Sequence, residues 1–256
     1  MKKTSKIVAV VLAALLVVAA VVVLAACNGG DNAAYGLVHN KGYVGKATVK
    51  MAGGKVVEAT LDEACFPTQV TAKEADGDYT VDVEKTNSST GAVTHTFYYK
   101  TVKWEGVTAV YDAADGYKVG DKKLVDFFAD EANCKVYFEA VAANGITVVT
   151  SAGEKTDIMN AASLLKSQHG YWGNPAEKAL GWKANKDATI NYVIENGFDG
   201  FDGIDKTSKD NGTIVDHSST NAKLDNEVVD KNGVATGATW TDFMDYFNLL
   251  KAAAGK

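Results

Sequence analysis

The chain has 256 residues and a mass of 27.1 kDa, and its 46% hydrophobic and 23% charged residues are the proportions of an ordinary folded protein. This composition excludes a disordered or collagen-like chain. All 26 basic residues are lysines, against 32 acidic residues, so the formal net charge is -6 and the pI is about 5.3. An acidic chain without arginine is not expected to bind nucleic acid.

The first 26 residues have the pattern of an export signal. Three lysines precede an uncharged apolar run from Ile7 to Ala26, which ends in small residues before Cys27. A basic start followed by an apolar run is typical of a signal peptide. The end of the run resembles the lipobox of bacterial lipoproteins, in which the cysteine carries an acyl chain such as palmitate and the leader is cut off just before it. The alternative is an uncleaved membrane-spanning helix, because the run is long enough to cross a bilayer.

These features predict a signal peptide over 1–26, a lipidated Cys27 with a flexible spacer over 27–34, and a folded domain over 35–256. The protein is then exported and anchored by lipid to the outer face of the cell membrane. The leader carries three lysines, so the mature chain is three charges more negative than -6. We therefore expect membrane contact through the lipid and not through a basic patch.

Two further cysteines, Cys65 and Cys134, would lie in a compartment that permits disulfides. A bridge between them and two separate buried thiols are both compatible with the sequence. Neither cysteine belongs to a C-x-x-C pair, and the four histidines are scattered. A metal site is therefore not expected.

The N-terminal third is typical of antiparallel β-structure. Residues 43–61 form two alternating runs around Gly53-Gly54, which is a hairpin signal. Residues 79–85 and 93–102 form a second pair of alternating runs around the turn residues 87–89.

The middle of the chain changes to a helical pattern. Helices are predicted over 122–129, 131–143, 156–167 and 187–196, with a further start at Asn174-Pro175. Residues 146–150 return as a strand, and residues 198–232 are polar and loop-like. The sequence thus predicts an α+β fold: an antiparallel sheet from the N-terminal hairpins, a helical insert at about 120–197 and a C-terminal helix.

A turn rich in small residues precedes that last helix. Thr236-Gly237-Ala238-Thr239 is followed by Trp240 and Thr241, and Thr241 or Asp242 is expected to cap the amphipathic helix. Glycine and alanine leave backbone N–H groups uncovered, and a helix N-terminus carries partial positive charge. A phosphate esterified to a threonine here is therefore expected to be held by backbone donors of the terminal helix.

This tetrad, with Thr241 and a helix after it, resembles the flavinylation motif of the FMN-binding domain family. Residues 43–49 and 54–57 are also similar to the start of such domains. The family includes the covalently flavinylated subunits of the sodium-pumping quinone reductase and of its ferredoxin-oxidising relative, and flavin-bearing extracytoplasmic lipoproteins. The resemblance implies that an FAD:protein FMN transferase, using magnesium, links the phosphate of FMN to Thr239.

The chain departs from the family pattern at one position. The family has an aspartate three residues before the tetrad, where this chain has Gly233. Asp230, three residues further upstream, is the candidate for the same role. A near copy of the tetrad, Thr90-Gly91-Ala92-Val93-Thr94, contains an extra valine and is interpreted as the turn of the second hairpin.

Aromatic side chains are expected around a flavin because its ring system is large and flat. Trp240 is the first candidate because it follows Thr239 directly. Trp172 and Trp182 are further candidates, and core packing is the alternative role for each.

Covalent FMN outside the cell favours an electron-transfer protein over a self-contained enzyme, because a tether prevents loss of the cofactor while the ring stays free for redox chemistry. No serine, histidine and aspartate constellation stands out in the sequence. We expect electrons to pass from a membrane quinone-linked donor to an extracytoplasmic acceptor. The alternative is an extracytoplasmic lipoprotein that binds a ligand or partner and carries no covalent flavin.

Overall fold

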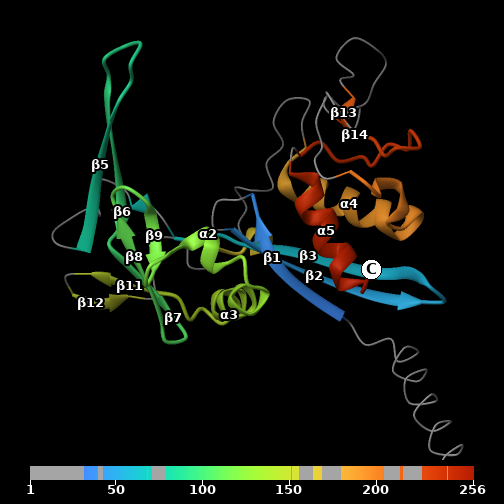
Figure 1. Cartoon of the computed structure of the whole chain (residues 1–256), viewed down its shortest axis with the longest axis horizontal. Helices are drawn as coiled ribbons and strands as arrows, with labels where there is room; N and C mark the ends of the chain where they lie inside the picture. The colour runs from blue at the N-terminus through green and yellow to red at the C-terminus, as the bar shows by residue number, and fades with distance from the viewer. Residues whose placement is uncertain are drawn as a thin grey trace, which may run out of the picture.

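The computed structural model describes residues 32–39, 43–67, 69–70, 79–150, 152–155, 164–168, 180–204, 214–215, 227–240 and 242–256. These residues form an α+β protein, as the sequence predicts. Every described strand pair is antiparallel. Figure 1 shows two helices from the end of the chain beside the first three strands, and the middle of the chain in a second group of strands.

The first sheet has the strand order β1-β2-β3, with β1 at Asn32–Val38, β2 at Tyr43–Ala52 and β3 at Lys55–Ala64. Its β2–β3 hairpin turns at Gly53-Gly54, which both have positive φ, and this confirms the predicted hairpin. The flexible spacer predicted over 27–34 ends three residues earlier than predicted, because β1 begins at Asn32. Asn32 to Ala34 pair with β2, and Ala34 is buried in the core.

Helices cover both faces of this sheet. Helix α3 (Glu131–Ala142) packs on one face, and α4 (Trp182–Asn196) and α5 (Phe243–Ala253) pack on the other. The strand alternation explains this, since Tyr35 joins the core with α3 while its neighbour Ala34 joins the core with α5. Figure 1 shows α4 and α5 together on one side of β1–β3.

Glycine at two strand positions lets α5 approach the sheet closely. A β-carbon on Gly45 of β2 would lie 2.7 Å from Leu249 Cδ2, and one on Gly36 of β1 would lie 3.3 Å from Leu249 Cδ1. These distances are shorter than normal carbon contacts. The glycines therefore fix how near the helix can lie to the strands.

The middle of the chain builds a six-stranded sheet that the sequence did not predict as one unit. Its order is β10-β9-β8-β7-β11-β12. The strands are β7 (Thr101–Trp104), β8 (Val107–Asp112), β9 (Gly116–Val119), β10 (Lys122–Lys123), β11 (Thr147–Thr150) and β12 (Gly153–Lys155). Trp104 and Tyr137 of α3 lie in one buried cluster, so this sheet and α3 share a core.

A second hairpin projects from this part of the molecule (Figure 1). It consists of β5 (Thr80–Thr86) and β6 (Val93–Tyr99), with β4 (Gln69–Val70) on the other edge of β6. Its turn contains the near copy of the tetrad, and Asn87 Oδ1 accepts the N–H groups of Ser89 and Thr90 there. The structure confirms that the near copy lies in the hairpin: residues 90–92 are in its turn, and Val93 and Thr94 begin β6.

The helical insert predicted at about 120–197 is partly correct. Helix α3 and strand β11 lie where the sequence predicts them. Helix α2 (Leu124–Phe127) is shorter than predicted, because Lys122–Lys123 pair with β9 as β10. Helix α4 begins at Trp182, five residues before the predicted start at Asp187, because Trp182 and Asn185 are buried and extend the helix.

The remaining described elements are short. They are the 3-10 helices η3 (Lys166–Gln168) and η5 (Asp199–Phe201) and the strands β13 (Ile214–Val215) and β14 (Glu227–Val228). The last three lie in the segment predicted as loop. The helix predicted over 156–167 falls largely outside the described residues, and the start at Asn174-Pro175 lies outside them entirely.

Candidate functional site

The tetrad at residues 236–239 lies between β14 and α5, and its backbone is held against β14. Thr236 donates from both its N–H and its hydroxyl to the carbonyl of Val228, each at 2.9 Å. Gly237 N–H donates to Glu227 Oε1 at 2.9 Å, and Val228 N–H donates to the carbonyl of Ala238 at 2.8 Å. Gly237 has a φ of 75°, a left-handed conformation that favours glycine. The tetrad is therefore a fixed turn.

Thr239 is tied to helix α4 by Asn185, a residue that the sequence analysis missed. Thr239 N–H donates to Asn185 Oδ1 at 2.6 Å, and the Thr239 hydroxyl lies 3.3 Å from the same oxygen. Asn185 Nδ2 donates to the carbonyl of Leu180 at 2.8 Å, and Asn185 is 3% exposed. An asparagine inside a polar helix belongs to no sequence motif. Only the tertiary contact identifies it.

The Thr239 hydroxyl lies at the N-terminus of α4. Leu180 N–H donates to Thr239 Oγ1 at 3.3 Å, two residues before the helix begins at Trp182. The N-cap residue Gly181 supplies no side-chain cap, and the first turn contains no acidic residue. The first N–H groups of a helix have no acceptor within the helix, and these groups and the dipole of the 15-residue helix favour an anion at this position.

The sequence predicted that the N-terminus of α5 would lie at the Thr239 hydroxyl, whereas the structure has the N-terminus of α4 there. Helix α5 begins at Phe243, with Asp242 at the N-cap position and Asp245 in its first turn. Two carboxylates there disfavour a phosphate. Asp242 occupies the predicted N-cap position, but its carboxylate makes no cap hydrogen bond and contacts His39 Nδ1 instead. Thr241, the other predicted cap, lies outside the described residues.

Aromatic side chains adjoin the tetrad. Trp240 stacks on Tyr246, with ring centroids 4.0 Å apart and ring planes 7° apart. The buried indole N–H of Trp240 has no hydrogen-bond partner among the described residues. Trp182 is the first residue of α4, and Lys186 Nζ lies 5.5 Å from its ring centroid. Trp172 lies outside the described residues.

Asp230 organises the loop before the tetrad. Its Oδ2 accepts the Tyr192 hydroxyl at 2.7 Å, and its Oδ1 accepts the N–H groups of Asn232 and Val234 at 2.8 Å each. Burial raises the pKa of this carboxyl, but the hydrogen bonds outweigh burial and hold the pKa below its usual value. Gly233 has a φ of 81°, which an aspartate would adopt only with strain. The backbone therefore accounts for glycine at this position.

A cluster of polar side chains adjoins Tyr246, and we call it the His39 cluster. Its members are His39 after β1, Glu63 of β3, Lys166 of η3, and Asp242, Asp245 and Tyr246 at the start of α5. The sequence analysis recorded His39 only as one of four scattered histidines. Its partners lie up to 207 positions away in the chain, which no spacing rule detects.

Hydrogen bonds and ion pairs join the cluster internally. The Tyr246 hydroxyl donates to Glu63 Oε2 and lies 2.5 Å from His39 Nε2. Lys166 Nζ lies 2.8 Å from Glu63 Oε1, and both residues are buried. His39 N–H donates to Asp245 Oδ2 at 2.9 Å. His39 also has a φ of 62°, which is uncommon for a residue other than glycine.

The cluster alters the acidity of its members. Burial lowers the pKa of His39, but the hydrogen bond and charge of Glu63, aided by Asp242, raise it above its ordinary value. Burial raises the pKa of Glu63, but His39 and Lys166 together hold it below its ordinary value. Burial and the Glu63 charge raise the pKa of Tyr246 far above its usual range. His39 and Glu63 therefore each favour the charged form of the other.

The two remaining cysteines are free buried thiols, so the structure does not contain the possible Cys65–Cys134 disulfide. Cys134 Sγ donates to the carbonyl of Phe128 at 3.0 Å, which points its sulfur along α3 toward α2. Burial raises the pKa of each thiol to about 12. Cys27, the predicted lipidation site, lies outside the described residues.

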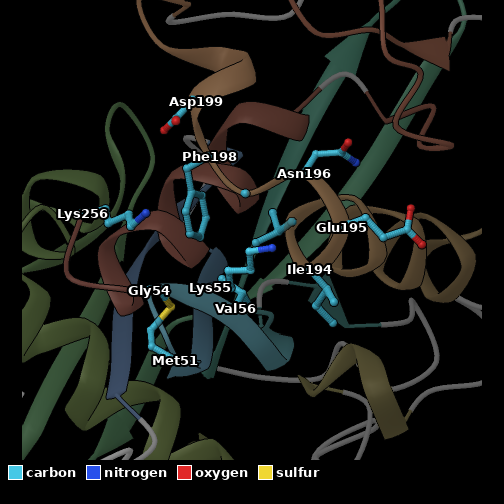
Figure 2. A pocket seen from close by; sticks show the side chains of 12 residues that line it. Met51, Gly54, Lys55, Val56, Ile194, Glu195, Asn196, Phe198, Asp199 and Lys256 are labelled. Carbon is cyan, nitrogen blue, oxygen red and sulfur yellow. The ribbon is translucent and has the colours of Figure 1, made fainter. Parts of the chain in front are cut away.

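A pocket lies at the opposite end of α4 from Thr239. Figure 2 shows it between the tip of the β2–β3 hairpin and the residues that end α4. Apolar Met51, Val56 and Phe198 and the amines of Lys55 and Lys256 line it. Helix α4 has 15 residues and rises about 1.5 Å per residue, so roughly 20 Å of helix separates the pocket from Thr239. The pocket is therefore separate from the tetrad.

Comparison with family models, with curated proteins and with solved structures finds no match to this chain. Among the described residues, each helix is too short or too polar to cross a bilayer.

Proposed function

We propose that this protein is a lipid-anchored extracytoplasmic flavoprotein that carries FMN on Thr239 through a phosphoester. In this proposal it passes electrons from a membrane quinol-linked donor to an extracytoplasmic acceptor. The observation that carries the proposal is the position of the Thr239 hydroxyl at the uncapped N-terminus of α4. The tetrad resembles a flavinylation motif, and its last hydroxyl lies where a phosphate is favoured.

The residues around Thr239 fit a phosphate on its oxygen. The hydroxyl already accepts the N–H of Leu180, and the first turn of α4 contains no acidic residue. Asn185 Oδ1 accepts the N–H of Thr239, so this bond persists after the hydroxyl proton is lost. Thr239 would thus stay anchored to α4 while its oxygen carries the ester.

The residues near Thr239 also fit a flat aromatic group. Trp240 presents an indole N–H without a partner among the described residues, and such a buried donor favours an acceptor from a ligand. Trp182 is the first residue of α4, two positions after Leu180, whose N–H donates to the Thr239 hydroxyl. When bound, FMN supplies one- and two-electron redox chemistry.

Attachment requires a partner enzyme, an FAD:protein FMN transferase with magnesium. Thr239 Oγ1 forms a bond to the phosphorus of the FMN half of FAD, AMP leaves, and the hydroxyl proton is lost to the transferase or to water. Asn185 Oδ1, 3.3 Å from the hydroxyl, orients that proton. The membrane location in this proposal rests on the leader and Cys27, whose acyl chain would hold the mature chain at the outer face of the membrane.

The test is flavinylation of the mature chain. The chain without its leader is coexpressed with an FMN transferase, denatured and weighed. We expect the mass of one FMN phosphoester on the wild-type chain and none on T239A. The matched control is T94A, which removes the last threonine of the near copy in the β5–β6 hairpin and should leave loading unchanged. An unmodified wild-type chain, under conditions that load a known acceptor protein, would contradict the proposal.

A binding protein without flavin is the second candidate, and the pocket in Figure 2 is the observation that favours it. Its apolar side chains suit a small amphiphile, and Lys55 and Lys256 line it together with Glu195 and Asp199. In that case T239A and wild type would bind such a ligand equally, while K55A would weaken the binding.

A further inference from the structure

The His39 cluster has no part in holding a phosphate on Thr239, yet it is connected to the tetrad. Trp240 follows Thr239 in the chain and stacks on Tyr246. The Tyr246 hydroxyl lies 2.5 Å from His39 Nε2 and donates to Glu63. Two side-chain contacts therefore lead from Trp240 to His39. This route ends on a residue that binds and releases protons near neutral pH.

The cluster runs from buried side chains to partly exposed ones. The side chains of Glu63 and Tyr246 are inaccessible, whereas 20% of the His39 side chain and 41% of the Asp242 side chain are exposed. His39 Nδ1 faces Asp242, and His39 Nε2 faces the buried pair. The imidazole therefore lies between solvent and the interior, which is the position that a proton acceptor needs.

Stability alone does not explain the buried charges. Glu63 and Lys166 form an ion pair from which water is excluded, and such pairs contribute little net stability because desolvation offsets their attraction. The pair does keep a negative charge fixed beside His39 Nε2. Lys166 balances that charge, so His39 can change its own protonation without leaving Glu63 unpaired.

We propose that His39 is the proton-binding residue of the redox site, with Tyr246 and Glu63 as positioning residues. This inference rests on the proposed function. Above its pKa, where the imidazole is neutral, His39 would bind one proton from water for each electron pair that FMN on Thr239 accepts from the donor. The imidazolium would return that proton to water when the pair passes to the acceptor. The added positive charge offsets the added negative charge nearby.

Every element packed around His39 contributes a group that faces it. These groups are Tyr43 of β2, Glu63 of β3, Lys166 of η3, and Asp242, Asp245 and Tyr246 at the start of α5. Only the histidine has an ordinary pKa between pH 5 and 8. The pKa values of Tyr43 and Tyr246 are raised, mainly by burial, away from this range. A proton bound near neutral pH is therefore assigned to His39.

The experiment compares wild type, H39Q and H95Q after FMN loading. His95 is an exposed histidine on β6 that pairs with Asp82, so H95Q removes a similar pair away from the site. Loading is verified first by mass, and the midpoint potential is then measured from flavin absorbance between about pH 5.5 and 9. One extra proton per electron pair steepens the fall of the potential by about 30 mV per pH unit.

We expect this extra slope in wild type and H95Q, above the ordinary pKa of histidine, and its loss in H39Q. Equal slopes in wild type and H39Q would overturn the inference and leave the proposed function intact. A chain without the FMN mass would overturn the proposed function and this inference with it. If H39Q does not fold, D242N replaces it, because loss of the carboxylate at Nδ1 should move the onset of the extra slope to lower pH.

A second readout measures the protonation of His39 in place of the potential. The imidazole signal of His39 is followed by NMR as a function of pH, before and after loading, with His95 as the internal reference. We expect loading followed by reduction to move the His39 midpoint to higher pH and to leave His95 unchanged. An unmoved His39 midpoint would also overturn the inference.

Discussion

The indole of Trp240 lies parallel to the phenol ring of Tyr246, with centroids 4.0 Å apart. This stack joins two parts of the molecule that the sequence keeps separate. One part is the turn that ends at Thr239, which Asn185 of α4 holds in place. The other is the buried ion pair of Glu63 and Lys166. A change at the turn therefore reaches the polar cluster through one pair of rings.

Removal of the stack should destabilise the C-terminal half of the protein. W240A loses the buried part of the indole and the ring contact, and we expect its free energy of unfolding to fall by about 2 to 4 kcal/mol. W240F keeps a ring over Tyr246 and should lose about 1 kcal/mol. Urea unfolding of the mature chain, followed by circular dichroism, measures both. Equal losses in the two variants would show that the stack contributes nothing.

Asn185 should matter for both stability and flavin loading. N185A leaves the N–H of Thr239 and the carbonyl of Leu180 without their partner, so we expect a loss of about 1 to 3 kcal/mol in the free energy of unfolding. The Thr239 hydroxyl is intact in this variant. A fall in FMN loading, measured by mass at a temperature where the variant stays folded, would then report misplacement of the hydroxyl. Loading at the wild-type rate would contradict the anchoring role.

The stability difference between wild type and H39Q should depend on pH. The folded-state pKa of His39 is raised above 6.5, mainly because Glu63 outweighs the effect of burial, so protonated His39 stabilises the fold fully below pH 6.5. This contribution is lost as the pH rises through the folded-state pKa.

The opposite sign applies to Glu63, whose lowered pKa means that its contribution is present above pH 4.5 and lost as the pH falls through the folded-state value. We expect H39Q to be less stable than wild type by about 1 to 3 kcal/mol near pH 6 and by less at pH 9. Urea midpoints at both pH values measure this difference. H95Q is the control, and a difference that grows with pH would contradict the assignment.

Close packing of α5 on the sheet predicts a graded response to added methyl groups. G45A places a β-carbon 2.7 Å from Leu249 Cδ2, and we expect a loss of about 1 to 3 kcal/mol in the free energy of unfolding. G36A meets Leu249 at 3.3 Å and should lose less. The double variant G45A with L249A should lose less than the sum of its single variants, because the clash disappears. Additive losses would contradict this contact.

The free thiols give a chemical test of the fold. Cys65 and Cys134 are buried and their pKa values are raised to about 12, so a thiol reagent at pH 8 should not modify them in the folded mature chain. Both should react after denaturation without any reductant. If neither Cys65 nor Cys134 reacts in the denatured, unreduced chain, a disulfide between them would be established.

Local patterns were enough to predict much of the secondary structure. Strict alternation around Gly53-Gly54 predicted β2 and β3, and the segment 131–143 ending at Asn144-Gly145 predicted α3. These features depend on residues that are neighbours in the chain. The same holds for the leader and for the tetrad, which remain predictions because their chemistry needs a lipid and a flavin.

The tertiary structure decided which helix meets the Thr239 hydroxyl. The sequence favoured α5 because it follows the tetrad directly, whereas the folded chain brings the N-terminus of α4 to that oxygen. Asn185, 54 positions before Thr239, makes this contact possible. Helix α4 has little amphipathic character, so its face toward the tetrad could not be read from its pattern.

The His39 cluster likewise exists only in the folded chain. Tyr246 lies 207 positions from His39 and 183 from Glu63, and each residue alone resembles an ordinary strand, loop or helix residue. Composition and periodicity determined the β2–β3 and β5–β6 hairpins and helix α3, because those depend on local backbone preference. The close packing of α5 on β1 and β2 determined the polar site, because charge interactions depend on distance in space.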